Sequence, residues 1–156
     1  MTDTDLIERF SGAYGFLSNF HYSTVVLNGD EYPTVEHAFQ SAKVVIFNHE
    51  KLDFARVAER EKIRLATFPA EAKRLGRKVK LGADWDDRRV FVMLGLLRQK
   101  FQDPVLGAQL LATGDAVLVE GNNWGDTFWG VVGDKGKNML GVLLQIVRYE
   151  LRKGLL

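Results

Sequence analysis

Helical periodicity in the second half of the chain is the feature that most limits its fold. Apolar residues recur at helical spacing over residues 85–101, at Val90, Met93, Leu94, Leu97 and Phe101. The same spacing recurs over about residues 138–152. Strand patterns do not alternate with these helices, so we do not expect a Rossmann sheet of βαβ units. The sequence therefore predicts a mainly helical α+β fold with a small β-sheet or hairpins.

Local signals predict the remaining elements. We expect further helices over residues 34–47, 51–61, 70–80 and 103–114. Asn28-Gly29 predicts a hairpin that joins residues 25–27 to residues 30–32, because both turn residues tolerate a positive φ. The apolar run 116–119 is expected to form a buried strand, and residues 11–20 an aromatic loop.

Length and composition limit the class of protein. A chain of 156 residues is long enough for one core, so a single domain over residues 1–156 is expected. The absence of cysteine excludes disulfides, thiolate metal sites and a thiol nucleophile, and the three histidines lack zinc-ligand spacing. We therefore expect no metal. A net charge of +1 argues against strong sequence-independent binding to nucleic acid. No apolar run reaches 18 residues, so we expect no membrane span and a cytoplasmic location.

Three polar side chains after Pro33 are the first candidate site. On a helix, Glu36, Gln40 and Lys43 share one face, while Ala38, Phe39 and Ala42 form the packing side. A carboxylate, an amide and an amine then project together. The alternative is a solvated polar face with an ordinary charged pair.

A basic stretch is the second candidate. Residues 71–80 contain five basic residues and one acidic residue, and Arg77 is suited to binding phosphate with two hydrogen bonds. The alternative is a solvated helix whose charge is balanced by the nearby acids Asp84, Asp86 and Asp87.

A glycine-rich loop over residues 119–130 is the third candidate. It contains two tryptophans, two acids and two asparagines. Loops of this composition are often functional, since tryptophan stacks on bases and carboxylates bind hydroxyls or water. The alternative is a tryptophan plug at the edge of the core. The glycines at 130, 133 and 136 lack the spacing of a nucleotide fingerprint and predict a turn.

Several stretches in order along the chain resemble the YbiA-like family, also called NADAR. They cover residues 16–20, 32–43, 72–77, 118–120, 126–130 and 136–141, together with Trp85, Arg89, Met93, Leu97, Lys100 and Phe101. The resemblance extends over about residues 10–152, which is the expected core of the domain. It implies a compact, helix-rich α+β domain that needs no metal or other cofactor.

The resemblance also implies an activity, the hydrolysis of N-glycosidic bonds in ribosylated substrates. The two substrate classes associated with the family are phosphoribosylamino-pyrimidine intermediates of riboflavin biosynthesis and ADP-ribose attached to guanine. The expected partner is thus a small ribosyl or ADP-ribosyl substrate, free or carried on DNA or RNA. A non-catalytic ADP-ribose or NAD-binding module is the alternative.

Roles for individual residues follow as hypotheses. Glu36 is the expected catalytic carboxylate, and Lys43 either a fixed cation or a Schiff-base amine. Asp126, the third catalytic candidate, is assigned with Glu120 to ribose hydroxyls or water. The remaining substrate-binding candidates are Asn19, Phe20, Gln40, Arg77, Lys80, Trp85, Trp129 and Asn138. Among them, the tryptophans are assigned to base or sugar packing, and Arg77 and Lys80 to phosphate.

Overall fold

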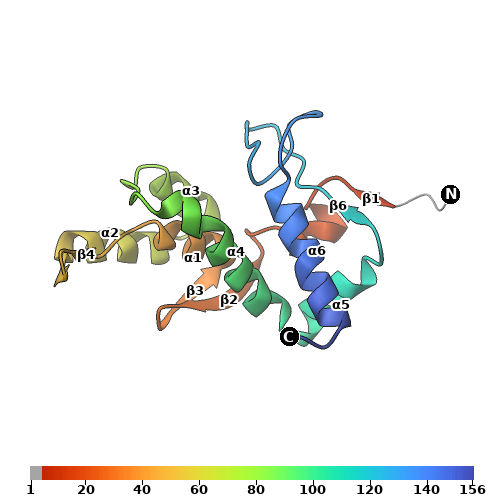
Figure 1. The fold of residues 1–156 in the computed structure, drawn as a ribbon, viewed down its shortest axis with the longest axis horizontal. Coiled ribbons are helices and arrows are strands. Elements are labelled where there is room, and N and C mark those ends of the chain that lie inside the picture. Colours follow the sequence, from red (N-terminus) through yellow and green to blue (C-terminus); the bar gives the residue numbers. More distant parts are fainter. Residues whose placement is uncertain (1–4) are drawn as a thin grey trace. The chain divides into compact units, whose positions relative to one another are not determined.

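The computed structural model describes residues 5–156, in which helices dominate (Figure 1). The α-helices are α1 (Val35–Ala42), α2 (Phe54–Arg64), α3 (Pro69–Gly76), α4 (Trp85–Phe101), α5 (Pro104–Ala112) and α6 (Met139–Arg152), and η1 (Gly12–Leu17) is a 3₁₀ helix. The strands are β1 (Leu6–Ile7), β2 (Tyr22–Leu27), β3 (Asp30–Thr34), β4 (Phe47–Asn48), β5 (Lys51–Leu52) and β6 (Val117–Leu118). β1 pairs with β6 in parallel, whereas β2–β3 and β4–β5 are antiparallel pairs. The predicted α+β class with a helical majority is confirmed.

The chain forms two compact units. The central unit comprises Asn19–Lys100, and the terminal unit comprises the residues up to Ser18 together with Phe101–Leu156. The prediction of a single domain over the whole chain stays a prediction.

Several predicted helix boundaries in the central unit are wrong. α3 ends at Gly76 instead of near residue 80, and α2 ends at Arg64 instead of residue 61. α1 ends at Ala42 instead of near residue 47, and the β-branched residues 44–46 lead into β4. α2 begins at Phe54 instead of residue 51, because the Asp53 carboxylate accepts hydrogen bonds from the backbone N–H groups of Ala55 and Arg56 at 3.0 and 3.2 Å. The residues before this cap form β5 instead of a helical turn.

The N-terminal region also departs from the predictions. The expected aromatic loop contains the 3₁₀ helix η1. The strand β6 was predicted, but its partner β1 has only two residues and therefore carries no periodic signal. The hairpin around Asn28-Gly29 is confirmed, with φ angles of 52° and 88° at the two turn residues.

Helix α1 is the centre of packing in the central unit. It contacts α2, α3 and the β2–β3 hairpin, and seven of its eight residues are buried. Val44, which follows α1 in the sequence, belongs to a buried cluster with Ile63, Ala72 and Val79. α4 supports the hairpin through Gln99, whose side-chain amide pairs with both the N–H and the C=O of Val26 at 2.8 Å.

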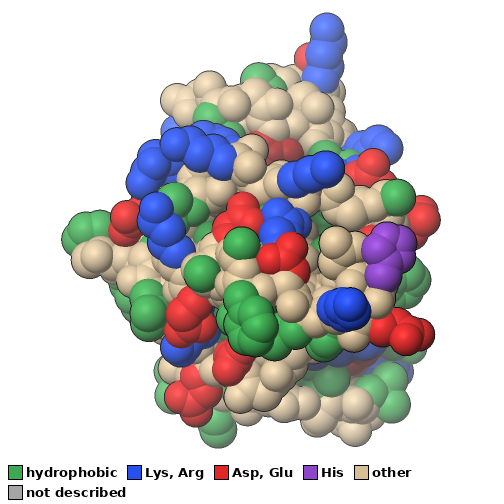
Figure 2. Space-filling view, turned by 90° about the vertical axis from the view of Figure 1, so that its left-hand side faces the viewer, with side chains coloured by type: hydrophobic (Ala, Val, Ile, Leu, Met, Phe, Trp, Pro, Cys, Tyr) green, Lys and Arg blue, Asp and Glu red, His purple; other side chains and the backbone are tan. Residues whose placement is uncertain are grey.

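The outer surface of α2 carries charges of both signs. Arg56 pairs with Glu59 at 2.8 Å, and Arg64 pairs with Glu61. Figure 2, which views the molecule from the α2 and β4 side, shows Lys and Arg interspersed with Asp and Glu. This face therefore carries charges of both signs, with several Lys and Arg side chains gathered at its upper left.

In the terminal unit, α6 packs against α5 and β6. Arg148 of α6 is only 5% exposed. Its guanidinium donates to Thr113 Oγ1 at 2.7 Å and to the carbonyl oxygen of Ala116 at 2.9 Å. These two hydrogen bonds join the segment between α5 and β6 to the buried side of α6. Arg152, one turn later, instead pairs with the exposed Asp115 at 2.8 Å.

This difference between the two arginines gives a stability prediction. We expect Arg148→Met to lower the free energy of unfolding by about 2–3 kcal/mol, because it leaves the buried Ala116 carbonyl without a donor. Arg152→Met is the matched control and is expected to change it by less than about 1 kcal/mol. Urea titrations followed by circular dichroism measure both. Equal losses in the two variants would contradict the role of Arg148.

Candidate active site

The central feature of the site is a carboxylate and an amide in direct contact on α1. Gln40 Nε2 donates to Glu36 Oε1 at 2.7 Å, and the two residues are 4% and 6% exposed. The alternative of a solvated polar face is therefore wrong for both side chains. The spacing of four residues places them on adjacent turns, as the sequence predicted.

The start of α1 fixes the position of Glu36. Thr34 Oγ1 accepts the N–H of His37 at 3.2 Å and so caps the helix. Glu36 consequently lies in the first turn, where the helix dipole favours a negative charge. Its own backbone N–H donates to the carbonyl oxygen of Asn19 at 3.1 Å, which brings residue 19 beside the site.

His37 is part of the scaffold. Its Nδ1 lies 2.8 Å from Thr34 Oγ1, and its Nε2 lies 2.9 Å from the carbonyl oxygen of Ala66. A carbonyl only accepts, so Nε2 carries the hydrogen and Nδ1 accepts from the threonine hydroxyl. Both ring nitrogens are thus used. Among residues 5–156, no group of three His, Cys, Asp or Glu residues is arranged to bind a metal ion.

Lys43 interacts electrostatically with the carboxylate and with two further cations. Lys43 follows α1 directly, and burial is the main cause that lowers the pKa of its ammonium group. The charges of Arg77 and Lys73 lower that pKa further, while the charge of Glu36 opposes them. These electrostatic effects show that one carboxylate and three cations share a small region of the central unit. Such a region favours a ligand with an anionic part.

Two further residues border this cluster. The Lys73 ammonium lies 5.8 Å from the centre of the Phe20 ring, at cation–π distance. Asn19 donates from Nδ2 to the sulfur of Met93 at 3.6 Å, while its buried Oδ1 has no hydrogen-bond partner among residues 5–156. Sequence reasoning did not select Lys73 as a site residue. Its signal is the spacing of four residues to Arg77, the C-cap residue of α3.

Other predicted residues of the central unit have structural neighbours. Trp85 is 4% exposed, and its ring centre lies 5.3 Å from that of Phe39. Lys80 is exposed, and its carbonyl oxygen accepts from Arg56 Nη2 at 2.9 Å. The acids expected to balance the basic stretch instead pair within α4 and just before it. Asp84 lies 2.7 Å from Arg88, and Asp86 lies 3.4 Å from Arg89.

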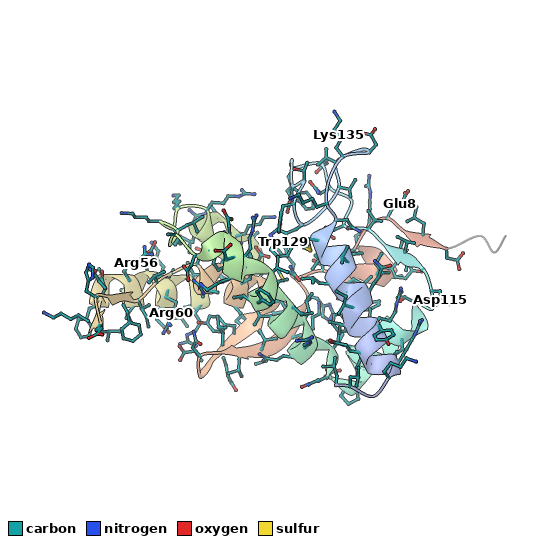
Figure 3. The ribbon with its side chains drawn as sticks, viewed as in Figure 1. Glu8, Arg56, Arg60, Asp115, Trp129 and Lys135 are labelled. Atoms are coloured by element: carbon teal, nitrogen blue, oxygen red, sulfur yellow. The ribbon has the colours of Figure 1, made fainter. Side chains whose placement is uncertain are left out.

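In the terminal unit, Asp126 organises its own loop. Its Oδ1 accepts the backbone N–H groups of Phe128 and Trp129 at 3.1 and 2.9 Å. Asn122 joins the same turn, because its side chain pairs with both the N–H and the C=O of Asp126. Trp129 is half-buried in this loop, near the start of α6 (Figure 3). Trp124 is 54% exposed, so the plug alternative is wrong for that residue.

Asn138 connects this loop to β6. Its backbone is left-handed, with a φ angle of 51°. Its side chain accepts the N–H of Glu120 at 2.9 Å and donates to the carbonyl oxygen of Leu118 at 2.8 Å. Gly141 permits this contact, since a Cβ at that position would lie 2.1 Å from the Leu118 oxygen. The structure thus brings Glu120 and Asn138 together, as it brings Glu36, Gln40 and Lys43 together in the central unit.

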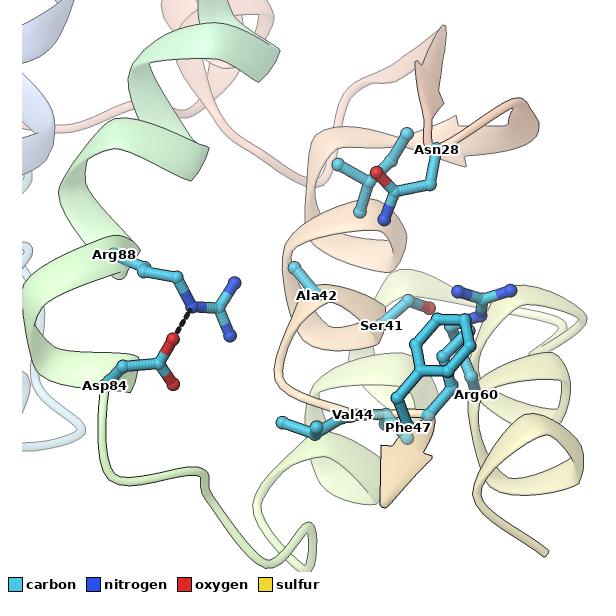
Figure 4. A pocket seen from close by; sticks show the side chains of 11 residues that line it. Asn28, Ser41, Ala42, Val44, Phe47, Arg60, Asp84 and Arg88 are labelled. Atoms are coloured by element: carbon cyan, nitrogen blue, oxygen red, sulfur yellow. Dashed lines mark ion pairs between the residues drawn. The ribbon is translucent and has the colours of Figure 1, made fainter. Parts of the chain in front are cut away.

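A pocket of about 660 Å³ lies in the central unit, beside Ser41 and Ala42 (Figure 4). Its two cations are already paired, Arg60 with Asp30 at 3.3 Å and Arg88 with Asp84 at 2.7 Å. Arg88 points toward Ala42 at the C-terminal end of α1, where a cation offsets the negative end of the helix dipole. None of the site residues predicted from the sequence lines this pocket.

Comparison with known proteins identifies the family of the chain. The NADAR domain model matches residues 8–152. The N-glycosidase YbiA of Escherichia coli strain K12 is 41% identical over 145 residues, which cover 90% of this chain and 84% of that protein. A riboflavin biosynthesis protein of Vibrio vulnificus is 40% identical over 144 residues. The chain spans 36% of the length of that protein.

The fold matches as well. The NMR structure of E. coli YbiA superimposes with a TM-score of 0.75 at 34% sequence identity, over 98% of this chain and 91% of the other. In the described residues, no helix is long and apolar enough to cross a membrane. A family match over most of the chain, supported by relatives of similar length, leads to one assignment: the chain belongs to the NADAR domain family.

Proposed function

We propose that the chain is an N-glycosidase that hydrolyses the bond between ribose C1 and a nitrogen of a nucleobase-type group. The observation that carries the proposal is the buried Glu36 carboxylate, which accepts from Gln40 and interacts electrostatically with Lys43. The names of the YbiA relatives support the reaction type.

The reaction separates charge at C1. The C1–N bond breaks with its electron pair going to the leaving nitrogen, which takes up a proton. The sugar becomes cation-like at C1, and the Glu36 carboxylate stabilises that charge. Water then adds its oxygen to C1 and releases a proton, so that the products are a free ribose derivative and a base.

The surrounding cations support a phosphorylated substrate. Lys43, Lys73 and Arg77 outnumber the single carboxylate of the cluster, and phosphate is the common feature of the two substrate classes. The name of the V. vulnificus relative supports a phosphoribosylamino-pyrimidine. ADP-ribosyl-guanine, free or carried on DNA or RNA, is the second class and rests on the family resemblance.

Two roles stay open for Lys43. As an ammonium group it binds a phosphate or stabilises the negative charge of the Glu36 carboxylate. As a neutral amine it attacks C1 of the ring-opened ribose, which is still bound to the base nitrogen as an imine. The C1–N bond to the base then breaks, the base leaves as a protonated amine, and a Schiff base remains between C1 and Lys43. Water hydrolyses this Schiff base, which releases the sugar aldehyde and restores the lysine amine. The lowered pKa of Lys43 increases the share of neutral amine available for the second role.

The first prediction about activity concerns Glu36. We expect Glu36→Gln to raise the barrier by about 3–5 kcal/mol, a loss of roughly 10²–10⁴-fold in rate, because the amide cannot stabilise a positive C1. ADP-ribosylated guanine DNA and phosphoribosylamino-pyrimidine are incubated side by side, and mass spectrometry follows the released sugar. Full activity of a folded Glu36→Gln variant would contradict the assignment of Glu36 as the catalytic carboxylate. Retained ADP-ribose binding without turnover by the wild type would favour the non-catalytic module.

The second prediction uses the charge next to Lys43. Lys73→Met removes a like charge, so the pKa of Lys43 rises toward its ordinary value. The limb of the pH–rate profile that depends on Lys43 is expected to move to higher pH. Activity falls along this limb with rising pH if Lys43 acts as a cation, and rises if it acts as an amine. Lys62→Met, at an exposed position of α2, is the control and leaves the limb in place.

The third prediction separates two roles of Asp126. Asp126→Ala is expected to lose about 1–2 kcal/mol of stability, because two backbone N–H groups lose their acceptor. Asp126→Asn keeps an oxygen in the same position and is expected to retain most of that stability. Thermal unfolding measures both effects. Turnover by the stable Asn variant then decides the catalytic assignment: unchanged turnover contradicts it, and lost turnover supports it.

A further inference from the structure

We infer that Gly76 is a positioning residue for the proposed reaction. Its missing side chain lets α3 approach α1 closely enough to fix the Gln40 amide against the Glu36 carboxylate. The inference rests on the proposed function and adds to it a residue that touches neither water nor substrate in that scheme.

The close approach is severe at Gly76. A Cβ at this position would lie 1.9 Å from Gln40 Oε1, 2.6 Å from Gln40 Cδ and 2.9 Å from Gln40 Cβ. The last of these atoms is the root of the side chain, which no rotation about its χ angles moves away. An alanine at position 76 therefore displaces the Gln40 side chain or the helix itself. Gly76 is buried at the end of α3, so an added methyl group cannot avoid the clash by moving into solvent.

The two ends of the Gln40 amide are held in different ways. Nε2 donates to Glu36 Oε1 at 2.7 Å, whereas the buried Oε1 has no hydrogen-bond partner among residues 5–156. The reverse orientation would set the amide oxygen against a carboxylate oxygen, two acceptors at hydrogen-bond distance. The oxygen end instead occupies the space that a side chain at position 76 would fill, so the backbone of α3 limits where it can move.

The same approach sets the position of the cations. Gly76 and the C-cap residue Arg77 follow Lys73 of α3 at spacings of three and four residues, which places them near the same side of the helix end. Lys73 and Arg77 are the residues whose charges act on Lys43. A displacement of α3 from α1 therefore moves these cations relative to Glu36 and Lys43 while it loosens Gln40.

The test compares two glycine substitutions in the full chain. Gly76→Ala is expected to lower kcat about 100-fold, because small displacements of a catalytic group carry costs of that order. KM is expected to rise as well, because the proposed phosphate-binding cations Lys73 and Arg77 move with α3. Gly95→Ala on α4 is the matched control: an added Cβ there meets no atom within 4 Å. This control is expected to keep wild-type kcat and to unfold at the same or a higher temperature.

Two further readouts separate positioning from a general packing defect. Without the Gln40 donor, the ionised Glu36 takes up a proton more readily, so the acidic limb of the pH–kcat profile is expected to move to higher pH. Gln40→Ala removes the two atoms nearest to the added Cβ. Gly76→Ala is therefore expected to lower the unfolding temperature less in that background, and the double variant stays poorly active.

The outcomes are distinct. A folded Gly76→Ala variant with wild-type kcat and pH profile overturns the inference. So does a variant whose activity falls only in proportion to its folded fraction, and so do independent effects of the two substitutions on stability. A wild-type protein that hydrolyses neither substrate instead defeats the proposed function, and the stability cycle then judges the Gly76–Gln40 contact alone.

Discussion

The burial of polar side chains on α1 is the constraint on which the central unit depends. A carboxylate, an imidazole and an amide lie on a helix of eight residues, seven of which are buried. Burying such groups without partners costs several kcal/mol. The Thr34 hydroxyl and the Ala66 carbonyl satisfy His37, and the Gln40 amide donates to Glu36. The surrounding elements thus supply hydrogen-bond partners for the buried polar groups of one short helix.

Opposing electrostatic effects define the character of the site. Burial and two neighbouring cations favour neutral Lys43, while Glu36 favours its charged form. The net charge of the whole chain is only +1, and the face over α2 is mixed in sign. The excess of positive charge is therefore a local property around α1 and α3. This arrangement suits recognition of an anionic group within a substrate better than general attraction to a polyanion.

The sequence predicted the parts of this arrangement that depend on periodicity. α4 and α6 were predicted almost to their ends, and the spacing of Glu36, Gln40 and Lys43 placed them on one face. Strands of two residues, such as β1, are too short to show a period. The importance of Gly76 was also hidden, since a glycine at the end of a helix ordinarily indicates only a C-terminus. Asp126 illustrates a third limit. An aspartate that accepts nearby backbone N–H groups has the same sequence signature as one that faces a substrate.

The loop between β6 and α6 is tied at its base and open at its ends. Backbone hydrogen bonds join Asn122 to Val131 and Val131 to Glu120, and Asn138 clamps the same end of β6. Beyond these ties, residues 123–125 and 133–136 are exposed. The hydrogen bonds at the base offset the entropy cost of closing the loop, and they do not depend on the side chains at the tips. Substitutions at the tips are therefore expected to change what the loop presents to a ligand while its hydrogen-bonded base stays in place.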